Sequence, residues 1–112
     1  MKLRINPEAF KDMESIKEYI SEELHNPDAA THILRHIIDS YNKLLDFPLM
    51  GPSLTSVTGI VTDFRYLVCG NYLIFYKADA EFISIYRVLY SKQDYIRTLF
   101  CALPENEDLQ NI

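Results

Sequence analysis

The hydrophobic period of this 112-residue chain changes near Pro48, and that change limits the folds it can adopt. Before Pro48, apolar residues recur at spacings of three and four, as in helices that bury one face. Further along, the segments "RYLVC", "YLIFYK" and "FISIYRVLY" are rich in the β-branched and aromatic residues that favour strands. A chain that places its helices first and most of its strands afterwards is expected to form an α+β domain, with helices against one face of a sheet.

The same pattern marks the starts of two helices. "NPEA" at Asn6 and "NPDA" at Asn26 each place Asn at the N-cap, Pro at the first helical position and an acid at the second. The apolar residues that follow keep helical spacing: Phe10, Met13, Ile16, Ile20 and Leu24 in the first helix, and Ala30, Ile33, Leu34, Ile37, Ile38, Tyr41, Leu44 and Leu45 in the second. Pro48, Gly51 and Pro52 end the second helix, and "SLTSVTG" is predicted to be a loop. The two helices should pair as an antiparallel hairpin.

The strand-rich segments predict a meander. Gly70-Asn71 supplies a two-residue hairpin turn, and "ADAE" supplies a looser turn. "KLRI" at residues 2–5 is a candidate opening strand, and the segment after Tyr90 has the character of a helical turn. The prediction is an N-terminal strand, a helix hairpin, a three-stranded antiparallel meander and a short C-terminal helix. The face of the sheet opposite the hairpin is expected to be free for a partner.

Composition indicates one folded domain. Hydrophobic residues make up 48% of the chain and charged residues 24%, which is typical of a globular domain. We expect this domain to span residues 1–100, followed by an acidic C-terminal tail at 101–112. No apolar signal region follows Lys2 and Arg4, and no segment approaches the length of a membrane span, so no membrane partner is expected. Cys69 and Cys101 are too few for a disulfide framework. A cytoplasmic location follows as an expectation.

The distribution of charge bears on possible partners. The formal net charge is -5, with acids in excess between residues 6 and 48 and again in the tail at Glu105, Glu107 and Asp108. Between residues 60 and 100 the signs nearly balance, so any positive patch should lie there. Long-range repulsion by the total charge would oppose binding to a polyanion. Free nucleic acid is therefore not expected to be the sole partner.

Sites for metals and cofactors find little support in the sequence. His32 and His36 have the i, i+4 spacing that can chelate zinc, but no Glu stands between them and only His25 is near as a third donor. No Gly-rich phosphate loop, Gly-x-Ser-x-Gly elbow or Cys-x-x-Cys pair occurs. We expect neither a metal nor a cofactor.

An ordered set of short motifs resembles a known family. The motifs are "YI" at Tyr19, "NPDAA" at Asn26, "FPLMG" at Phe47, "RYLV" at Arg65, "YLIFY" at Tyr72 and "IYRVLYSKQDY" at Ile85. Together they resemble the RelE/ParE toxins of bacterial type II toxin–antitoxin systems over about the first hundred residues. The resemblance implies a toxin that inhibits growth and that is bound by a cognate antitoxin protein. It also agrees with the fold predicted above.

The resemblance implies three alternatives for the function. A ParE-like toxin binds and poisons DNA gyrase, which needs a complementary surface and no catalytic group. A RelE-like toxin enters the ribosome and cuts mRNA. An inactive relative would remain only a binding module. Many members carry His and Arg where this chain has Tyr90 and Gln93, and ribosome-dependent ribonucleases typically carry Arg where it has Leu73. These departures favour the ParE-like alternative.

Each alternative predicts its own site residues. A ribonuclease without metal needs an acid, a base and cations around the phosphate, and the candidates are Arg65, Arg87, Tyr90, Lys92 and Tyr95. A partner-binding surface would use Arg87, Lys92, Ile96, Arg97, Leu99 and Phe100.

Each candidate for catalysis also has a structural interpretation. Arg87 shares strand parity with Ile83, Ile85 and Leu89 and could instead be a structural cation, paired with a carboxylate such as Asp94. Arg65 could be a surface charge at a strand end. Tyr90 and Tyr95 could pack against the helix hairpin.

Overall fold

A four-stranded sheet organises residues 1–100, the part of the chain that the computed structural model describes. The strands are β1 (Lys2–Ile5), β2 (Arg65–Cys69), β3 (Tyr72–Ala78) and β4 (Phe82–Tyr90), and their order in the sheet is β1-β4-β3-β2. Strands β2, β3 and β4 form the predicted antiparallel meander, whereas β1 pairs in parallel with β4. Gly70 adopts a φ of 60° in the two-residue turn between β2 and β3, as its position predicted. The expected acidic tail at 101–112 lies outside the described residues.

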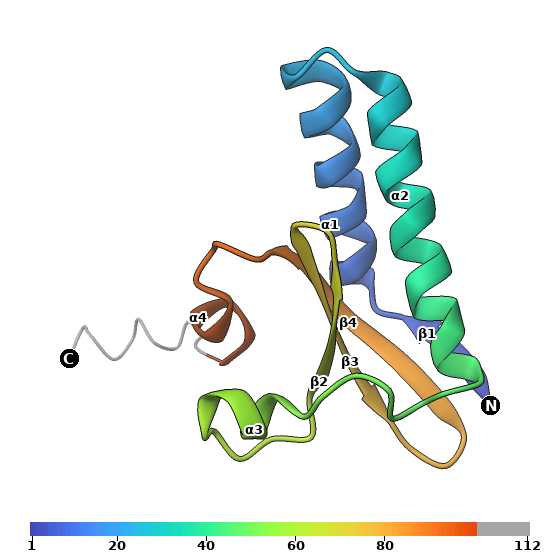
Figure 1. The fold of residues 1–112 in the computed structure, drawn as a ribbon, viewed down its shortest axis with the longest axis vertical. Coiled ribbons are helices and arrows are strands. Elements are labelled where there is room, and N and C mark those ends of the chain that lie inside the picture. The colour runs from blue at the N-terminus through green and yellow to red at the C-terminus, as the bar shows by residue number, and fades with distance from the viewer. Residues whose placement is uncertain (101–112) are drawn as a thin grey trace.

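The predicted helix hairpin covers one face of the sheet (Figure 1). It consists of α1 (Pro7–Glu18), extended by a π-helical turn (Tyr19–Glu23), and of α2 (Pro27–Asn42), extended by a 3₁₀ turn (Lys43–Leu45). The side chain of Asn26 accepts a hydrogen bond from the backbone N–H of Ala29 at 3.1 Å, as an N-cap does. Asn6 makes no such side-chain bond. No helix within residues 1–100 combines the length and apolar character needed to cross a membrane.

The opposite face of the sheet is partly covered, contrary to the expectation that it would be free. Helix α3 (Leu54–Thr58) and helix α4 (Tyr95–Phe100) lie on this side (Figure 1). Their side chains pack with strand residues in a second apolar cluster: Leu54, Phe64, Leu73, Phe75 and Leu89, with Tyr66, Tyr86, Tyr95 and Leu99 against them. The covered face buries apolar area that a free face would expose to water.

Helix α3 lies inside the segment predicted to be a loop, so that prediction was wrong. The hydroxyl of Ser53 accepts a hydrogen bond from the N–H of Thr55 at 3.2 Å, and Gly59 ends the helix with a φ of 78°. Leu54 is buried and anchors the helix on the sheet. Burial of one leucine therefore outweighs the weak helical preference of the Ser- and Thr-rich sequence around it.

An irregularity in β4 changes which side chains face the hairpin. Tyr76 of β3 pairs with Ile85, but the neighbouring Phe75 pairs with Arg87, so Tyr86 is an extra residue on β4. After this bulge, Val88 lies in the hairpin-side core together with Ile83 and Ile85, and Leu89 lies in the second cluster. The sequence analysis expected Leu89 to face the same side as Ile83 and Ile85, and this fails because that expectation assumed an unbroken strand.

Burial of tyrosines predicts the behaviour of the fold at high pH. Desolvation raises the pKa of Tyr41, Tyr72 and Tyr76 above the ordinary 10.0, and Tyr72 is raised further by the neighbouring phenols of Tyr90 and Tyr19. Because the folded state keeps these phenols neutral, their contribution to stability is complete below about pH 10 and is lost as pH rises through the folded pKa values.

A tyrosinate absorbance titration measures this effect directly. Part of the eight tyrosines should ionise later in the folded chain than in urea. Identical titration curves in both states would contradict the prediction.

Candidate partner-binding groove

The outer edge of β4 changes partners halfway along the strand. Strand β1 ends where Ile5 pairs with Ile85, and the N–H of Asn6 donates to the carbonyl of Ile85 at 2.9 Å as the chain turns into α1. Beyond that point, no other strand within residues 1–100 pairs with this edge. Unpaired edge groups invite aggregation or need another partner.

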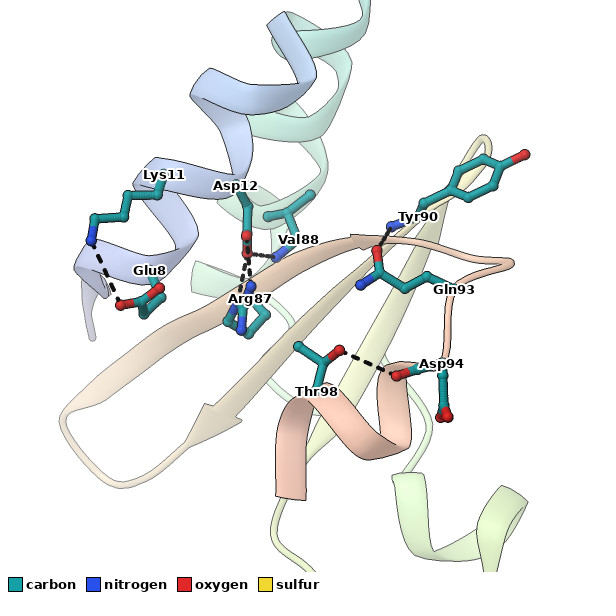
Figure 2. A network of polar contacts seen from close by, with 9 residues as sticks. All are labelled: Glu8, Lys11, Asp12, Arg87, Val88, Tyr90, Gln93, Asp94 and Thr98. Atoms are coloured by element: carbon teal, nitrogen blue, oxygen red, sulfur yellow. Dashed lines mark hydrogen bonds and ion pairs between the residues drawn. The ribbon is translucent and has the colours of Figure 1, made fainter. Parts of the chain in front are cut away.

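A carboxylate of α1 takes the place of the missing strand. Asp12 Oδ2 accepts hydrogen bonds from Val88 N at 2.9 Å and Arg87 Nε at 2.8 Å, and Asp12 Oδ1 accepts from Arg87 Nη2 at 2.8 Å (Figure 2). The side chain of Asp12 is 12% exposed, and that of Arg87 is 25% exposed. This two-point ion pair therefore joins α1 to β4 in a largely desolvated setting.

The ion pair decides the structural role of Arg87. Its hydrogen bond to Asp12 raises the pKa of Arg87 against the opposing effect of burial.

The carboxylate proposed from sequence as the partner of Arg87 was Asp94, and that assignment is wrong, because Asp94 instead starts α4. The side chain of Asp94 accepts from Arg97 N at 3.2 Å, and its carbonyl accepts from the hydroxyl of Thr98 at 3.2 Å (Figure 2).

The last N–H group of β4 is also occupied by a side chain. Tyr90 N donates to Gln93 Oε1 at 3.3 Å, and Gln93 N donates back to the carbonyl of Tyr90 at 3.1 Å. Since alternate residues of a strand point their N–H groups to the same edge, Val88 and Tyr90 supply the outer donors of this part of β4. Both are already bonded, so a partner would contact this region through side chains rather than by adding a strand.

A groove of about 710 Å³ lies between the hairpin and this end of β4. We call it the hairpin groove; its apolar walls come from Ile16, Ile20, Leu24, Tyr72 and Val88. The Asp12–Arg87 ion pair lines the groove too, and Tyr19, Leu24 and Tyr90 are 54%, 55% and 43% exposed at it. Exposed aromatic and aliphatic side chains beside a concave surface are typical of a site that receives anchoring side chains of another protein.

The candidate ribonuclease residues do not gather in one cavity. Arg87 and Tyr90 line the hairpin groove, whereas Arg65 lines a second cavity and Lys92 and Tyr95 line neither. Tyr90 lies on the hairpin side and pairs with the ring of Tyr72 at 6.0 Å between centroids.

Tyr95 and Leu73 lie in the second apolar cluster, away from both cavities. Tyr95 was expected to pack against the hairpin, but its ring lies 5.3 Å from that of Phe75 in the cluster on the opposite face. Leu73 is buried in that same cluster.

The candidate partner-binding residues divide in a similar way. Leu99 packs into the second cluster, and the ring of Phe100 lies 5.8 Å from that of Phe64. Ile96 is half-buried, while Lys92 and Arg97 are exposed. Lys92, Arg97 and Phe100 are therefore the exposed members of this set, and a partner can reach them without moving α4.

Sequence reasoning missed three residues that the structure brings into the two cavities. Asp12 is one of many acids in the helical half of the chain, and its contacts with Arg87 and Val88 cross at least 75 positions. Arg4 and Lys77 join Arg65 at the second cavity. The sequence places Lys77 directly after the strand motif "YLIFY", which indicates a position at a strand end, but nothing in the sequence links Lys77 to Arg4.

Comparisons with known proteins agree with this architecture. The family model described as the ParE toxin of the type II toxin–antitoxin system parDE matches residues 3–95. A solved structure titled "Chromosomal ParDE TA system from P. aeruginosa" has a TM-score of 0.69 at 19% identity, covering 82% of this chain and 97% of that one. No curated protein sequence matches this chain significantly.

The matched fold and family model define the protein as a toxin of a type II toxin–antitoxin system. The chain belongs to the ParE toxin family, and this confirms the family resemblance and the fold class predicted from the sequence.

Proposed function

We propose that this toxin acts in the cytoplasm by binding and poisoning DNA gyrase, and that a cognate antitoxin inhibits it by filling the hairpin groove. The observation that carries the first half is the state of Arg87, whose guanidinium is bound at two points by Asp12. A cation already neutralised in this way is poorly available to stabilise a phosphate in a cleavage reaction. A surface that acts by binding alone does not need it.

The position of Leu73 supports the same choice. Its side chain is buried among Phe75, Leu89 and their neighbours, so an apolar cluster occupies the place where the ribonuclease relatives were expected to carry a cation. Lys92 and Arg97 remain exposed near the start of α4 and are suited to a protein interface. Rim charges of this kind change association rates and affinity moderately rather than acting in an all-or-none way.

The shape of the hairpin groove supports the second half of the proposal. Its walls are apolar, and the donors of the adjoining strand edge are occupied by Asp12 and Gln93. An amphipathic antitoxin segment could place apolar side chains between Ile20, Leu24 and Tyr72. Coexpression of the antitoxin should therefore relieve growth inhibition, and a Leu24→Asp variant of the toxin should escape that relief.

Two assays on the purified toxin test the mechanism. Micromolar toxin should inhibit gyrase supercoiling and accumulate cleaved DNA, while toeprinting on translating ribosomes should show no cuts. Lys92→Ala and Arg97→Ala should each weaken gyrase inhibition by roughly 5- to 150-fold, the range for losing one interface contact of about 1–3 kcal/mol. These exposed residues are preferable to Arg87, whose removal disturbs the fold.

The control variant is Lys11→Ala, which removes an exposed cation on α1. It should leave gyrase inhibition unchanged. Ribosome-dependent cuts in mRNA, with gyrase unaffected, would show that the protein is a ribonuclease instead; loss of those cuts by orders of magnitude in Lys92→Ala would then assign the cation a role in the chemistry.

A further inference from the structure

A second cavity, of about 460 Å³, lies at the end of the sheet that carries the β3–β4 turn. We call it the cationic pocket; its lining includes Arg4, Arg65, Lys77, Ser53, Thr62 and Ser84. It shares no lining residue with the hairpin groove. The family match and the function proposed above make no use of it.

Neutral partners hold the three cations of this pocket in place. The guanidinium carbon of Arg4 lies 3.9 Å from the ring centre of Phe82. The ammonium of Lys77 lies 4.6 Å from the ring centre of Phe64 and 5.2 Å from that of Tyr86. Arg65 Nη1 donates to the carbonyl of Gly51 at 2.7 Å. Within residues 1–100, none of the three forms an ion pair with a carboxylate.

The hydroxyl groups of the pocket also have donor capacity to spare. Ser84 Oγ accepts from Arg4 Nε and Nη2, each at 3.3 Å, and Ser84 is only 7% exposed. Thr62 Oγ1 accepts from Phe64 N, and Ser53 Oγ accepts from Thr55 N. In the described part of the chain no protein acceptor takes the hydrogen of any of these three hydroxyls. A buried donor without an acceptor costs about 1–3 kcal/mol, so the pocket favours a ligand that only accepts.

Two carboxylates of the lining, Asp63 and Asp79, offset only part of the positive charge of the three cations. Asp79 Oδ1 accepts from the backbone N–H groups of Glu81 at 2.8 Å and Phe82 at 2.7 Å, and these bonds lower the pKa of Asp79. Its charge therefore stabilises the turn that follows β3, and the nearby charge of Arg4 lowers the pKa of Asp79 by a smaller amount. Three cations against two carboxylates leave one formal positive charge in the pocket, in a chain whose net charge is -5.

We propose that the cationic pocket binds a phosphate group, with Arg4, Arg65, Lys77 and the Ser84 hydroxyl donating to its oxygens. Each strand of the sheet supplies one donor: β1 carries Arg4, β2 carries Arg65, β3 carries Lys77 and β4 carries Ser84. The donors therefore approach a ligand from several directions. A tetrahedral oxyanion offers acceptors in all of these directions, whereas a planar carboxylate offers two oxygens on one side. The phosphate group can belong to a free phosphate or to the backbone of a nucleic-acid strand.

Nuclear magnetic resonance titration of the purified toxin tests the proposal without gyrase or antitoxin. Inorganic phosphate should shift the backbone amide signals of Thr62, Lys77 and Ser84 in a saturable way. Lys77→Met keeps the aliphatic stem over the rings of Phe64 and Tyr86 but removes the charge, and it should weaken binding about tenfold or more. The matched control Lys92→Met removes an exposed cation outside the pocket and should leave binding unchanged.

A second titration identifies the source of the phosphate. A short single-stranded DNA without terminal phosphates that shifts the same amides and competes with inorganic phosphate would support a backbone phosphate, and its failure to do so while inorganic phosphate binds would support a free one. Shifts that do not saturate, or an equal loss of binding in Lys92→Met, would overturn the site. So would an acidic peptide that binds at these amides when phosphate does not.

A further variant and a stability measurement protect the test against loss of fold. Ser84→Ala removes the buried hydroxyl with little change in volume, and it should also weaken phosphate binding. Melting temperatures of all variants should stay near that of the parent chain. If Ser84→Ala and Lys77→Met both fold and both bind phosphate as the parent does, the proposal is wrong.

Discussion

Replacing Asp12 with alanine should destabilise the toxin by about 3 kcal/mol or more, a large part of the total stability of a domain of this size. The reason is that one carboxylate satisfies both the Arg87 guanidinium and the N–H of Val88. Its removal leaves a cation that is only 25% exposed without its partner and a strand-edge donor without an acceptor. Chemical denaturation of the purified chain, followed by circular dichroism, measures the change.

The same helix supplies a matched control. Glu8 forms an ion pair with Lys11 at 3.9 Å, but these side chains are 61% and 73% exposed. Glu8→Ala should therefore change stability by no more than about 1 kcal/mol, most of it from losing an acid in the first turn of α1. If Asp12→Ala were as mild as Glu8→Ala, the ion pair would not be what joins α1 to the free edge of β4.

A double variant separates the charge from the packing. Replacing Asp12 with leucine and Arg87 with methionine removes both charges and fills similar volume. Buried pairs replaced in this way often regain most of the stability that a single deletion loses. The double variant should thus be more stable than Asp12→Ala, although Val88 N–H still lacks an acceptor. It also tests gyrase inhibition without Arg87 in a chain that folds.

Local signals explain why the main architecture could be predicted from the sequence. The Asn-Pro-acid pattern, apolar residues at helical spacing, and a Gly-Asn turn between β-rich segments each depend on neighbours within a few positions. Each corresponds to a physical preference that holds before the chain packs. The hairpin, the meander and the β2–β3 turn therefore appear where these signals place them.

The failures lie where tertiary contacts decide. Helix α3 depends on burying Leu54 against the sheet, and the bulge at Tyr86 depends on pairing with β3. The partner of Arg87 is an acid on α1 that no local pattern distinguishes from its neighbours.

Tertiary contacts also decide how the candidate site residues are distributed over the fold. Predicted cations were chosen by their place in motifs, but Arg65 and Arg87 line separate cavities. Arg4 belongs with Arg65 only because β1 joins the sheet beside β4. Sites assembled from distant strands are set by topology, so residue type and spacing alone cannot define them.

Replacing Gly51 with alanine should cost about 2–3 kcal/mol, because the backbone there is packed directly against β2 and β3. A Cβ built at Gly51 would overlap the carbonyl oxygen of Tyr66 and lie 2.8 Å from the hydroxyl of Tyr76. That hydroxyl accepts a hydrogen bond from Gly51 N at 3.0 Å and donates to the carbonyl of Pro48 at 2.9 Å. The added methyl group would thus push apart the contacts that hold the segment after α2 on the sheet.

Two comparisons make this prediction specific to close packing. Gly59→Ala is the control, since nothing lies within 4 Å of a Cβ there and its cost comes only from the φ of 78°, about 1 kcal/mol. Tyr76→Phe alone should cost about 1–3 kcal/mol by breaking two buried hydrogen bonds. Because it also removes the hydroxyl that the methyl group of Gly51→Ala would meet, the combined variant should lose less than the sum of the two single losses. Additive losses, or a smaller effect at Gly51 than at Gly59, would mean that the segment moves away at little cost and that Tyr76 does not fix it.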